Sequence, residues 1–391
     1  MSILLNATEQ VISEKNLQEK IEKKKKLRIK FGADPSAPDL HFGHLVILKK
    51  LRDFQDLGHQ VDFVIGDFTG MIGDPSGRSK TRPILTKQMV EENARTYQDQ
   101  VFKILDKEKT QVVFNSQWHG KMSFEKALSL TSVVTLARII EREDFMNRYK
   151  SGTPISITEL IYPIIQAYDS VVLESDVEVG GTDQTFNLLL GRELQKEFKQ
   201  EPQVVMTLPI LPGVDGKMKM SKSLGNSISL QDIPKEMFGK IMSIPDDLIM
   251  PYFRSLTPLD EKSFDEMEKA MSDGENPKTF KEKLARQLVE MFHGAPAANE
   301  AANEFAQIFK IRGTPKEMEE IFFDQDQLDV IELIEASKKF SSRSEIRRLI
   351  NGGGVYYCGE KIKSDQKEVK MVDEGILKLG KRIFFRTKKK S

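Results

Sequence analysis

Short apolar runs alternate with longer amphipathic segments over the first half of the chain. The runs have the length and residue types of buried strands, and the longer segments repeat their apolar residues with helical spacing. Because strands separated by helices build a parallel sheet from βαβ units, this alternation predicts an α/β domain over residues 1–229. The expected strands are residues 27–31, 61–65, 111–114, 170–173, 177–179 and 203–208, and the expected helices are residues 8–26, 45–57, 88–106 and 123–147.

The apolar pattern changes after residue 230, where the strand signals stop. Helical spacing continues, which predicts a mostly α-helical domain over residues 230–320. An acidic stretch over 313–327, which carries Pro315, is typical of a linker. A small α+β domain is then expected over residues 328–391. Its expected elements are helices at 328–339 and 344–351, a glycine turn at 352–354, and strands at 355–357 and 382–385.

Composition narrows the class of protein. The 391 residues carry a formal net charge of zero, with 39% apolar residues, which suits a soluble protein of two or three domains. The one cysteine, Cys358, excludes an intrachain disulfide and fits a reducing compartment. The N-terminus lacks the features of a signal peptide, and no run approaches the ~20 apolar residues of a membrane span. We therefore expect a cytoplasmic protein with no membrane partner.

Positive charge is concentrated at the end of this neutral chain. Residues 338–391 contain 16 basic and six acidic residues, a net charge of +10. Tyr356 and Tyr357 are expected to be exposed there, so the region predicts contacts with RNA phosphates. A solubilising tail is the alternative, although the expected glycine turn favours a folded domain.

Two histidines lie between an expected strand and an expected helix. His41 and His44 flank Gly43 at a helix N-terminus, where backbone N–H groups and the helix dipole favour an anion. Imidazoles can donate to phosphate oxygens, and the glycine leaves space for a flat ligand, so we expect ATP there. A metal pair would require a third protein ligand, and a purely structural pair is the other alternative.

A lysine-rich loop is the second candidate phosphate site. Lys219 and Lys222 alternate with Ser221 and Ser223, and Met220 between them does not look like a core residue. Such a loop can close over a triphosphate and stabilise the charge that develops as pyrophosphate departs. A solvated basic loop is the alternative.

A glycine-rich loop follows the expected strand at 61–65. Its Asp74 can anchor an ammonium group, and Arg78 and Arg82 can reach phosphate. A polar surface loop is the alternative interpretation.

Two further motifs carry polar groups that a ligand could satisfy. On a helix, Tyr162, Gln166 and Asp169 share one face among apolar neighbours, and a buried polar trio must be hydrogen-bonded. A phenolic amino acid would satisfy it, and a structural cluster is the alternative. The Gly-Gly-Thr-Asp-Gln run at 180–184 follows an expected strand, and its Asp183 could accept from a ribose diol.

Together these motifs resemble those of a known family. His41-Phe-Gly-His44 and Lys219-Met-Ser-Lys-Ser223 are similar to the two signature motifs of class I aminoacyl-tRNA synthetases. The runs at 73–77, 162–169 and 180–184 resemble those of the bacterial tyrosyl-tRNA synthetases, and residues 341–363 resemble an S4 RNA-binding module. The resemblance covers essentially the whole chain.

The resemblance implies an architecture and a reaction. It implies a Rossmann-like catalytic domain over 1–229, an α-helical anticodon-recognition domain over 230–320 and an S4-like domain over 328–391. The implied enzyme activates L-tyrosine with ATP to tyrosyl-adenylate and transfers it to the 3′ end of tRNA(Tyr). Mg²⁺ would accompany ATP without a dedicated protein metal site, and relatives are homodimers.

The resemblance also implies a role for each matching residue. Around the triphosphate and the rest of ATP it places His41, His44, Lys219, Lys222, Ser36, Gly43, Arg78, Arg82, Gly181, Asp183 and Ser223. Around tyrosine it places Asp34, Thr69, Asp74, Tyr162, Gln166, Asp169 and Gln184, with Asp169 accepting from the phenol.

One position departs from the family pattern. The best-known members have a tyrosine two residues before Gly32 as a second partner of the substrate hydroxyl, and this chain has Lys30. Either Lys30 points elsewhere, or Asp169 has a different helper. Arg78 is a milder departure, because many relatives have lysine. Three alternatives remain at this stage: a tryptophanyl-tRNA synthetase, a small-molecule adenylyltransferase and a non-catalytic RNA-binding relative.

Overall fold

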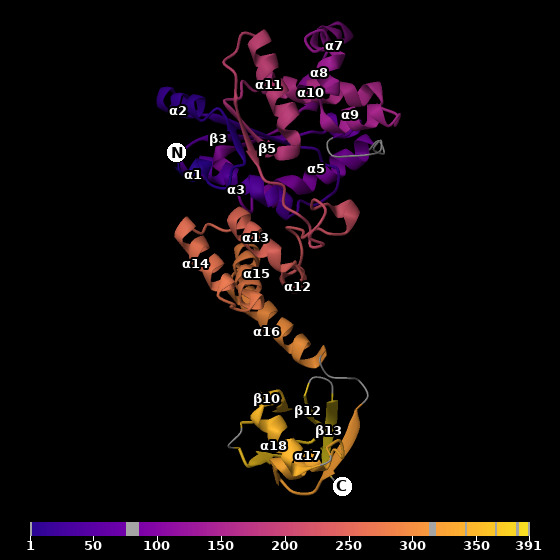
Figure 1. Ribbon diagram of the computed structural model, residues 1–391. Coiled ribbons are helices and arrows are strands. Elements are labelled where there is room, and N and C mark those ends of the chain that lie inside the picture. Colours follow the sequence, from indigo (N-terminus) through magenta and orange to yellow (C-terminus); the bar gives the residue numbers. More distant parts are fainter. Residues whose placement is uncertain are drawn as a thin grey trace. The chain divides into compact units, whose positions relative to one another are not determined.

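The computed structural model describes residues 2–75, 86–312, 318–340, 342–363, 366–380 and 383–389. The chain forms two compact units, Met1–Ala302 and Asn303–Ser391. Figure 1 draws most of the first unit in indigo, magenta and orange, and the second in orange and yellow. The finer division of residues 1–320 into a catalytic and a helical domain stays a prediction.

A six-stranded sheet organises the first unit. Its strand order is β1-β6-β5-β2-β3-β4, in which β2 to β6 run parallel and β1 pairs antiparallel with β6 at the edge. The predicted α/β class with a parallel sheet is therefore confirmed. The strands are β1 (Gln10–Ile12), β2 (Arg28–Ala33), β3 (Gln60–Ile65), β4 (Thr110–Phe114), β5 (Val177–Gly181) and β6 (Val204–Leu208).

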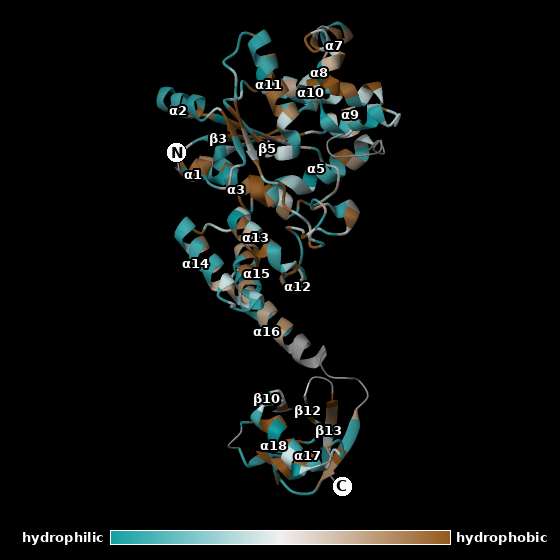
Figure 2. Ribbon diagram, in the orientation of Figure 1, coloured by the Kyte–Doolittle hydropathy of each residue, from teal (hydrophilic) through white to brown (hydrophobic). Residues whose placement is uncertain are grey.

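Helices flank this sheet and bury its strands. All five residues of β6 and all but one of β3 and β5 are buried, as expected for parallel strands that are covered on both faces. Figure 2 shows hydrophobic colour along these inner strands and hydrophilic colour on outer helices such as α2. The helices are α1 (Ser2–Leu5), α2 (Glu14–Lys23), α3 (Phe42–Asp56), α4 (Thr69–Ile72), α5 (Lys87–Val101), α6 (Ser116–His119), α7 (Phe124–Thr131), α8 (Leu136–Ile140), α9 (Glu143–Lys150), α10 (Ile157–Val172) and α11 (Thr185–Glu197).

The described residues between 230 and 312 form helices joined by loops and no strand, as predicted. A proline occupies the first turn of both α12 and α15, where its missing N–H and its fixed φ favour a helix start. One face of α15 is fully buried through Leu284 and Leu288. The helices are α12 (Pro234–Met242), α13 (Ile249–Leu256), α14 (Glu261–Ser272), α15 (Pro277–His293) and α16 (Ala295–Arg312). Within the described ranges, no helix has the length and apolar character to cross a membrane.

The second unit packs two helices on a small sheet. Its five-stranded sheet has the order β10-β9-β12-β13-β7, and β11 pairs separately with β8. Ile334, Val355 and Leu377 lie in its fully buried core. The elements are β7 (Glu319–Phe323), β8 (Gln327–Asp329), α17 (Val330–Glu335), α18 (Arg343–Asn351), β9 (Val355–Tyr357), β10 (Glu360–Lys361), β11 (Glu368–Lys370), β12 (Gly375–Leu379) and β13 (Ile383–Lys389).

Several predicted elements of the first unit were wrong. The single helix expected over 8–26 is interrupted by β1, because Val11 and its neighbours pair with the exposed edge of β6. The strand expected over 170–173 belongs to the end of α10, since a short apolar run does not distinguish a strand from a buried helical turn. The helix expected over 123–147 is three helices, and Ser123 and Thr135 each cap a new start.

Several predicted elements of the second unit were also wrong. The expected linker over 313–327 contains strand β7, which pairs with β13, and the expected helix over 328–339 begins as strand β8. Tyr357 is buried rather than exposed: its hydroxyl lies 2.9 Å from Oγ1 of Thr387. The alternation of β9 explains this, because Val355 and Tyr357 face the core together.

Candidate active site

The sheet opens a crevice between β2 and β5. These two strands pair only at Ile29–Val177 and Lys30–Glu178, whereas β2 continues to pair with β3 as far as Ala33–Ile65. The strand order reverses at this point, and such a switch point is where open parallel sheets bind ligands.

A cavity of about 290 Å³ occupies this crevice and collects most of the predicted site residues. The side chain of Ser223 and the whole of Arg78 and Arg82 lie outside what the structure describes. Lys222 is not among the residues that line the cavity. Those that do line it are Asp34, Ser36, His41, Gly43, His44, Thr69, Asp74, Tyr162, Gln166, Asp169, Gly181, Asp183, Gln184 and Lys219.

The two histidines cap helix α3 reciprocally. Nδ1 of His41 accepts from the Gly43 N–H at 3.1 Å, and Nδ1 of His44 accepts from the His41 N–H at 3.3 Å. Because both Nδ1 atoms accept, the proton of each neutral ring is on Nε2. The two ring centroids are 4.2 Å apart.

Burial keeps both imidazoles neutral. It lowers the pKa of His41 to about 2, and the charges of His44, Lys222 and Lys219 contribute in the same direction. It lowers the pKa of His44 to about 4, again with a contribution from Lys222. At neutral pH the rings can therefore offer Nε2–H donors to phosphate oxygens, and the positive charge of the site comes from its lysines.

The lysine loop lies beside these histidines. Lys219 Nζ donates to Asp183 Oδ2 at 3.1 Å, and Lys222 is paired with Asp39. A phosphate group could take the place of these carboxylates as the lysines' partner. Met220 was expected outside the core and is in fact buried, 5% exposed, with its backbone N–H bonded to Leu211.

Asp34 holds two of the predicted tyrosine-site residues. Tyr162 donates its hydroxyl to Oδ2 of Asp34 at 3.0 Å, and Thr69 donates to Oδ1 at 2.6 Å. Burial, with the charges of Asp34 and Asp74, raises the pKa of Tyr162 well above its ordinary value, so its hydroxyl remains a donor. Gly66 is required here, because an added Cβ would lie 2.1 Å from Oδ1 of Asp34.

Asp169 lies at the buried end of the same helical face. Its Oδ1 accepts from the Trp118 indole at 2.8 Å and lies 2.7 Å from Nε2 of His119. Its Oδ2 accepts from Asn115 at 3.3 Å. The sequence reasoning missed these three partners, although all follow the predicted strand at 111–114, where parallel strands direct ligand-binding residues.

A second missed residue, Asn187, joins two predicted ones. Its Nδ2 donates to Oε1 of Gln166 and to Oε1 of Gln184, each at 2.9 Å. Gln184 in turn donates to Oδ2 of Asp74 at 2.9 Å, and Arg142 donates to Oδ1 of Asn187 at 3.1 Å. The side-chain amides of Gln166 and Gln184, which line the cavity, are therefore held in place by Asn187. Across the described part of the chain, no group of three or more His, Cys, Asp or Glu could hold a metal ion.

Comparison with known proteins assigns this arrangement to a family. The model of the family "tRNA synthetases class I (W and Y)" matches residues 22–310. The chain belongs to this class I tRNA synthetase family. Membership confirms the predicted enzyme class, an ATP-dependent ligase that acts on tRNA.

Individual relatives of this class I tRNA synthetase are similar over nearly their full length. The tyrosine–tRNA ligase of Thermotoga maritima is 50% identical over 99% of this chain and 96% of its own. That of Geobacter metallireducens is 50% identical over 99% of this chain and 98% of its own. The crystal structure of tyrosyl-tRNA synthetase from Archaeoglobus fulgidus, complexed with L-tyrosine, is 26% identical with a TM-score of 0.64, and covers 77% of this chain and 98% of its own.

Proposed function

We propose that this chain is a tyrosine–tRNA ligase, which activates L-tyrosine with ATP and transfers the tyrosyl group to the 3′ end of tRNA(Tyr). The observation that carries the proposal is Asp169, a buried carboxylate aimed by Trp118, His119 and Asn115 at the end of a cavity. An indole N–H could donate to the same carboxylate, so tryptophan is the second candidate. The 50% identity to tyrosine–tRNA ligases favours tyrosine.

In the first step the tyrosine carboxylate attacks the α-phosphorus of ATP, and pyrophosphate leaves. No protein nucleophile is required, so the protein positions the reactants and stabilises charge on the departing group. The neutral Nε2–H groups of His41 and His44 and the ammonium groups of Lys219 and Lys222 supply that stabilisation. We assign the same phosphate side to Ser36, Arg78, Arg82 and Ser223.

The amino acid is selected at the other end of the cavity. Asp169 accepts from the phenol, while Tyr162, Gln166 and Asp74 hold the ammonium group and Gln184 lies near the carboxylate. Asp34 and Thr69 line the pocket, and Asp183 contacts the adenosine part, where Gly43 and Gly181 leave room. A site that hydrogen-bonds a hydroxyl rejects the analogue that lacks it by about 10⁴–10⁵, and tyrosyl-tRNA synthetase is itself an established example.

Mg²⁺ enters this scheme as part of the substrate, bound to the phosphates of ATP. We assign Mg²⁺ no protein ligand; among the described residues, no group of three or more His, Cys, Asp or Glu could hold a metal ion. The ion would neutralise phosphate charge beside the lysine loop.

We also propose that the enzyme is cytoplasmic, like the translation reaction it serves.

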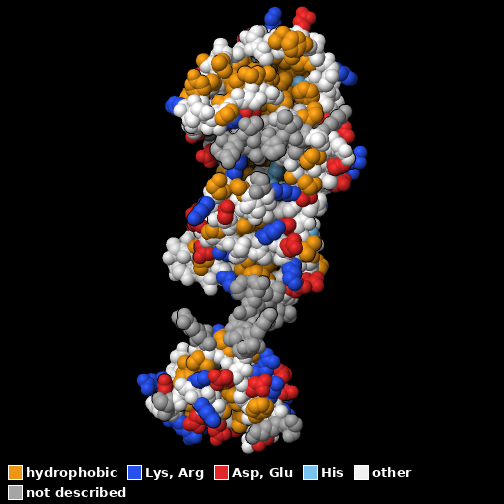
Figure 3. Space-filling model, turned by 90° about the vertical axis from the view of Figure 1, so that its right-hand side faces the viewer, with side chains coloured by type: hydrophobic (Ala, Val, Ile, Leu, Met, Phe, Trp, Pro, Cys, Tyr) orange, Lys and Arg blue, Asp and Glu red, His pale blue; other side chains and the backbone are white. Residues whose placement is uncertain are grey.

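An exposed apolar surface supports the proposal that the enzyme is a homodimer. Phe124, Leu136 and Ile157 are 79%, 61% and 71% exposed. Figure 3 views the side where α7, α8 and α9 lie in Figure 1, and hydrophobic side chains gather there. Clusters of this kind mark protein–protein contacts in soluble proteins. We also propose that residues 328–391, within the second unit, form an S4-like domain that contacts tRNA phosphates.

Pyrophosphate exchange into ATP, measured with each of the twenty amino acids, tests this function. We expect exchange with tyrosine and background rates with the others. Exchange with tryptophan alone would favour the second candidate. A folded protein that supports exchange with no amino acid would be a non-catalytic RNA-binding relative.

A further inference from the structure

Lys30 has no donor to offer a substrate. Its side chain is fully buried, and Nζ donates to Glu178 Oε1 at 2.8 Å, to Ser170 Oγ at 2.8 Å and to the Gln166 carbonyl at 3.2 Å. An ammonium group has three N–H donors, and all three are engaged. Lys30 therefore stands where the family has a substrate-reading tyrosine, but it points into the protein.

The Lys30–Glu178 pair forms the floor of the cavity. The two residues are cross-strand partners in the last rung between β2 and β5, immediately before these strands separate. Both residues line the cavity although both are buried. The pair is therefore close to the ligand site without being accessible to solvent.

Both carboxylate oxygens of Glu178 are also hydrogen-bonded within the protein. Its Oε2 accepts from Ser170 at 3.0 Å and from the side-chain amide of Gln203. Helix α11 makes room for these contacts with Gly191: an added Cβ would lie 2.6 Å from Nε2 of Gln203 and 3.2 Å from Oε2 of Glu178. Glycine is unfavourable inside a helix, so a close approach of this kind accounts for its presence.

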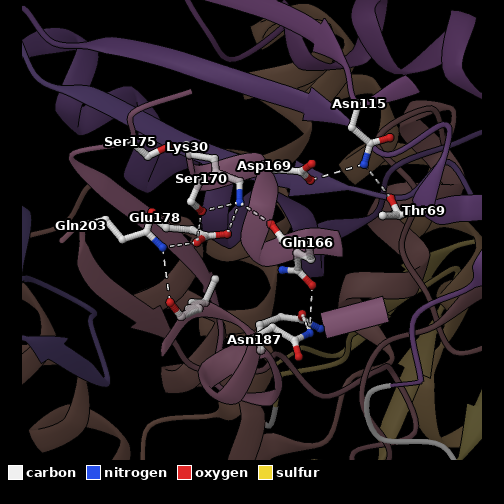
Figure 4. A network of polar contacts seen from close by, with 12 residues as sticks. Lys30, Thr69, Asn115, Gln166, Asp169, Ser170, Ser175, Glu178, Asn187 and Gln203 are labelled. Carbon is white, nitrogen blue, oxygen red and sulfur yellow. Dashed lines mark hydrogen bonds and ion pairs between the residues drawn. The ribbon is translucent and has the colours of Figure 1, made fainter. Parts of the chain in front are cut away.

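The contacts of the pair lie on both sides of Asp169. Ser170 follows Asp169 directly, and the Gln166 carbonyl lies one helical turn before Ser170 (Figure 4). The same turn of α10 carries the Gln166 amide and the Asp169 carboxylate toward the cavity. The ammonium group therefore bonds both ends of the turn that presents two selecting side chains.

We propose that Lys30 and Glu178 are positioning residues for amino-acid selection, which fix this turn of α10 against the floor of the pocket. The inference rests on the proposed function. Stability alone is a poor explanation of the pair, because the desolvation of two buried charges offsets most of their attraction. Placement is a better one, since a displacement of about 1 Å in a binding group can cost 10²-fold in rate.

The double variant Lys30→Met/Glu178→Gln tests this proposal, because it removes the ammonium and the carboxylate together and leaves no unpaired charge. In pyrophosphate exchange we expect the KM for tyrosine to rise about tenfold and the KM for ATP to stay within about twofold. We also expect the ratio of kcat/KM for tyrosine to that for phenylalanine to fall at least tenfold. A purely structural role would lower the melting temperature and leave this ratio unchanged.

Lys20→Met is the matched control. Lys20 is another buried lysine, 1% exposed and 3.5 Å from Asp176, but it does not line the cavity. We expect its substitution to lower stability without changing the tyrosine-to-phenylalanine ratio.

Ser170→Ala is the second test variant and applies if the double variant does not fold. It removes one acceptor of Lys30 and one donor to Glu178 in a single small change. We expect the same direction of effect with a smaller size, about threefold. An unchanged ratio in a folded variant, or equal rises in both KM values, would overturn the proposal. Absence of tyrosine-dependent exchange in the unaltered protein would instead overturn the proposed function.

Discussion

The indole N–H of Trp118 donates to Oδ1 of Asp169 over 2.8 Å. His119 lies against the same oxygen, so Oδ1 is saturated by the protein, whereas among the described residues Oδ2 accepts only from Asn115 at 3.3 Å. One oxygen of the carboxylate is thus fully hydrogen-bonded by the protein. The other oxygen can still accept a further hydrogen bond. Within the described residues, the contacts that orient Asp169 therefore come from Trp118, His119 and Asn115.

Replacement of Asp169 should abolish the recognition of tyrosine. In Asp169→Ala the substrate phenol loses its acceptor, and Trp118 and His119 lose theirs, so kcat/KM for tyrosine should fall at least about 10³-fold. Steady-state pyrophosphate exchange measures this. Asp56→Ala, which removes a carboxylate that is 55% exposed, is the control. Near-normal exchange by Asp169→Ala would refute the assignment.

The lysine loop should act on the rate of adenylate formation and not on the binding of tyrosine. Lys222→Ala and Lys219→Ala each remove a cation from the departing pyrophosphate, so kcat should fall about 10²–10³-fold while the KM for tyrosine stays within about twofold. Lys217→Ala, an exposed position in the same loop, should be close to normal. Equal effects on kcat and on tyrosine binding would contradict the assigned role.

The two half-buried histidines should make stability depend on pH in one direction. Their pKa values are about 4 for His44 and about 2 for His41, below the unfolded value of about 6.5, so between pH 6.5 and 4 the unfolded chain binds protons that the folded chain does not. The melting temperature should therefore fall as pH is lowered through this range. His44→Asn should show a shallower decline in calorimetry. An identical slope in both proteins would show that His44 does not contribute.

Removal of the second unit should separate the two steps of the reaction. A chain that ends at residue 312 should retain pyrophosphate exchange within about twofold, because the cavity lies wholly in the first unit. It should lose aminoacylation by about 10²-fold or more as its phosphate contacts disappear. A cut at 330 is a poorer choice, because strand β7 would lose its partner β13. Unchanged charging of tRNA would contradict the RNA-binding role.

A polar substitution on the exposed apolar surface should prevent dimer formation. Phe124→Asp combined with Leu136→Asp places two charges where a partner would bury apolar area, so sedimentation velocity should detect a monomer at micromolar concentration. Ile233→Asp, at a position that is 57% exposed, is the control and should leave the assembly unchanged. An unaltered sedimentation coefficient in the double variant would exclude this surface as the interface.

The sequence pattern predicted the site residues at the ends of the strands better than it predicted the residues that contact them. The motifs around His41 and Asp183 are recognisable because a parallel sheet directs its loops to one edge, which is a local property of the pattern. Trp118 and His119 were missed because their shared partner, Asp169, lies 51 and 50 residues further along the chain. Asn187 was missed because its contact with Gln166 spans 21 residues. The end of α10 was misread because its short apolar run does not distinguish a strand from a buried helical turn. The contacts of Ser170 with Lys30 and Glu178 come from distant parts of the chain.

The pairing of β7 with β13 has a mechanical consequence. The two strands are parallel, and five residues of one are in register with five of the other, from Phe385–Glu319 to Lys389–Phe323. A force that pulled residues 319 and 389 apart would shear these strands along their length. The evenly spaced hydrogen bonds of a parallel pair would then bear the load together and not open one at a time. The second unit should therefore resist extension between residues 319 and 389 more strongly than a pull across the pair, which would open its hydrogen bonds one at a time.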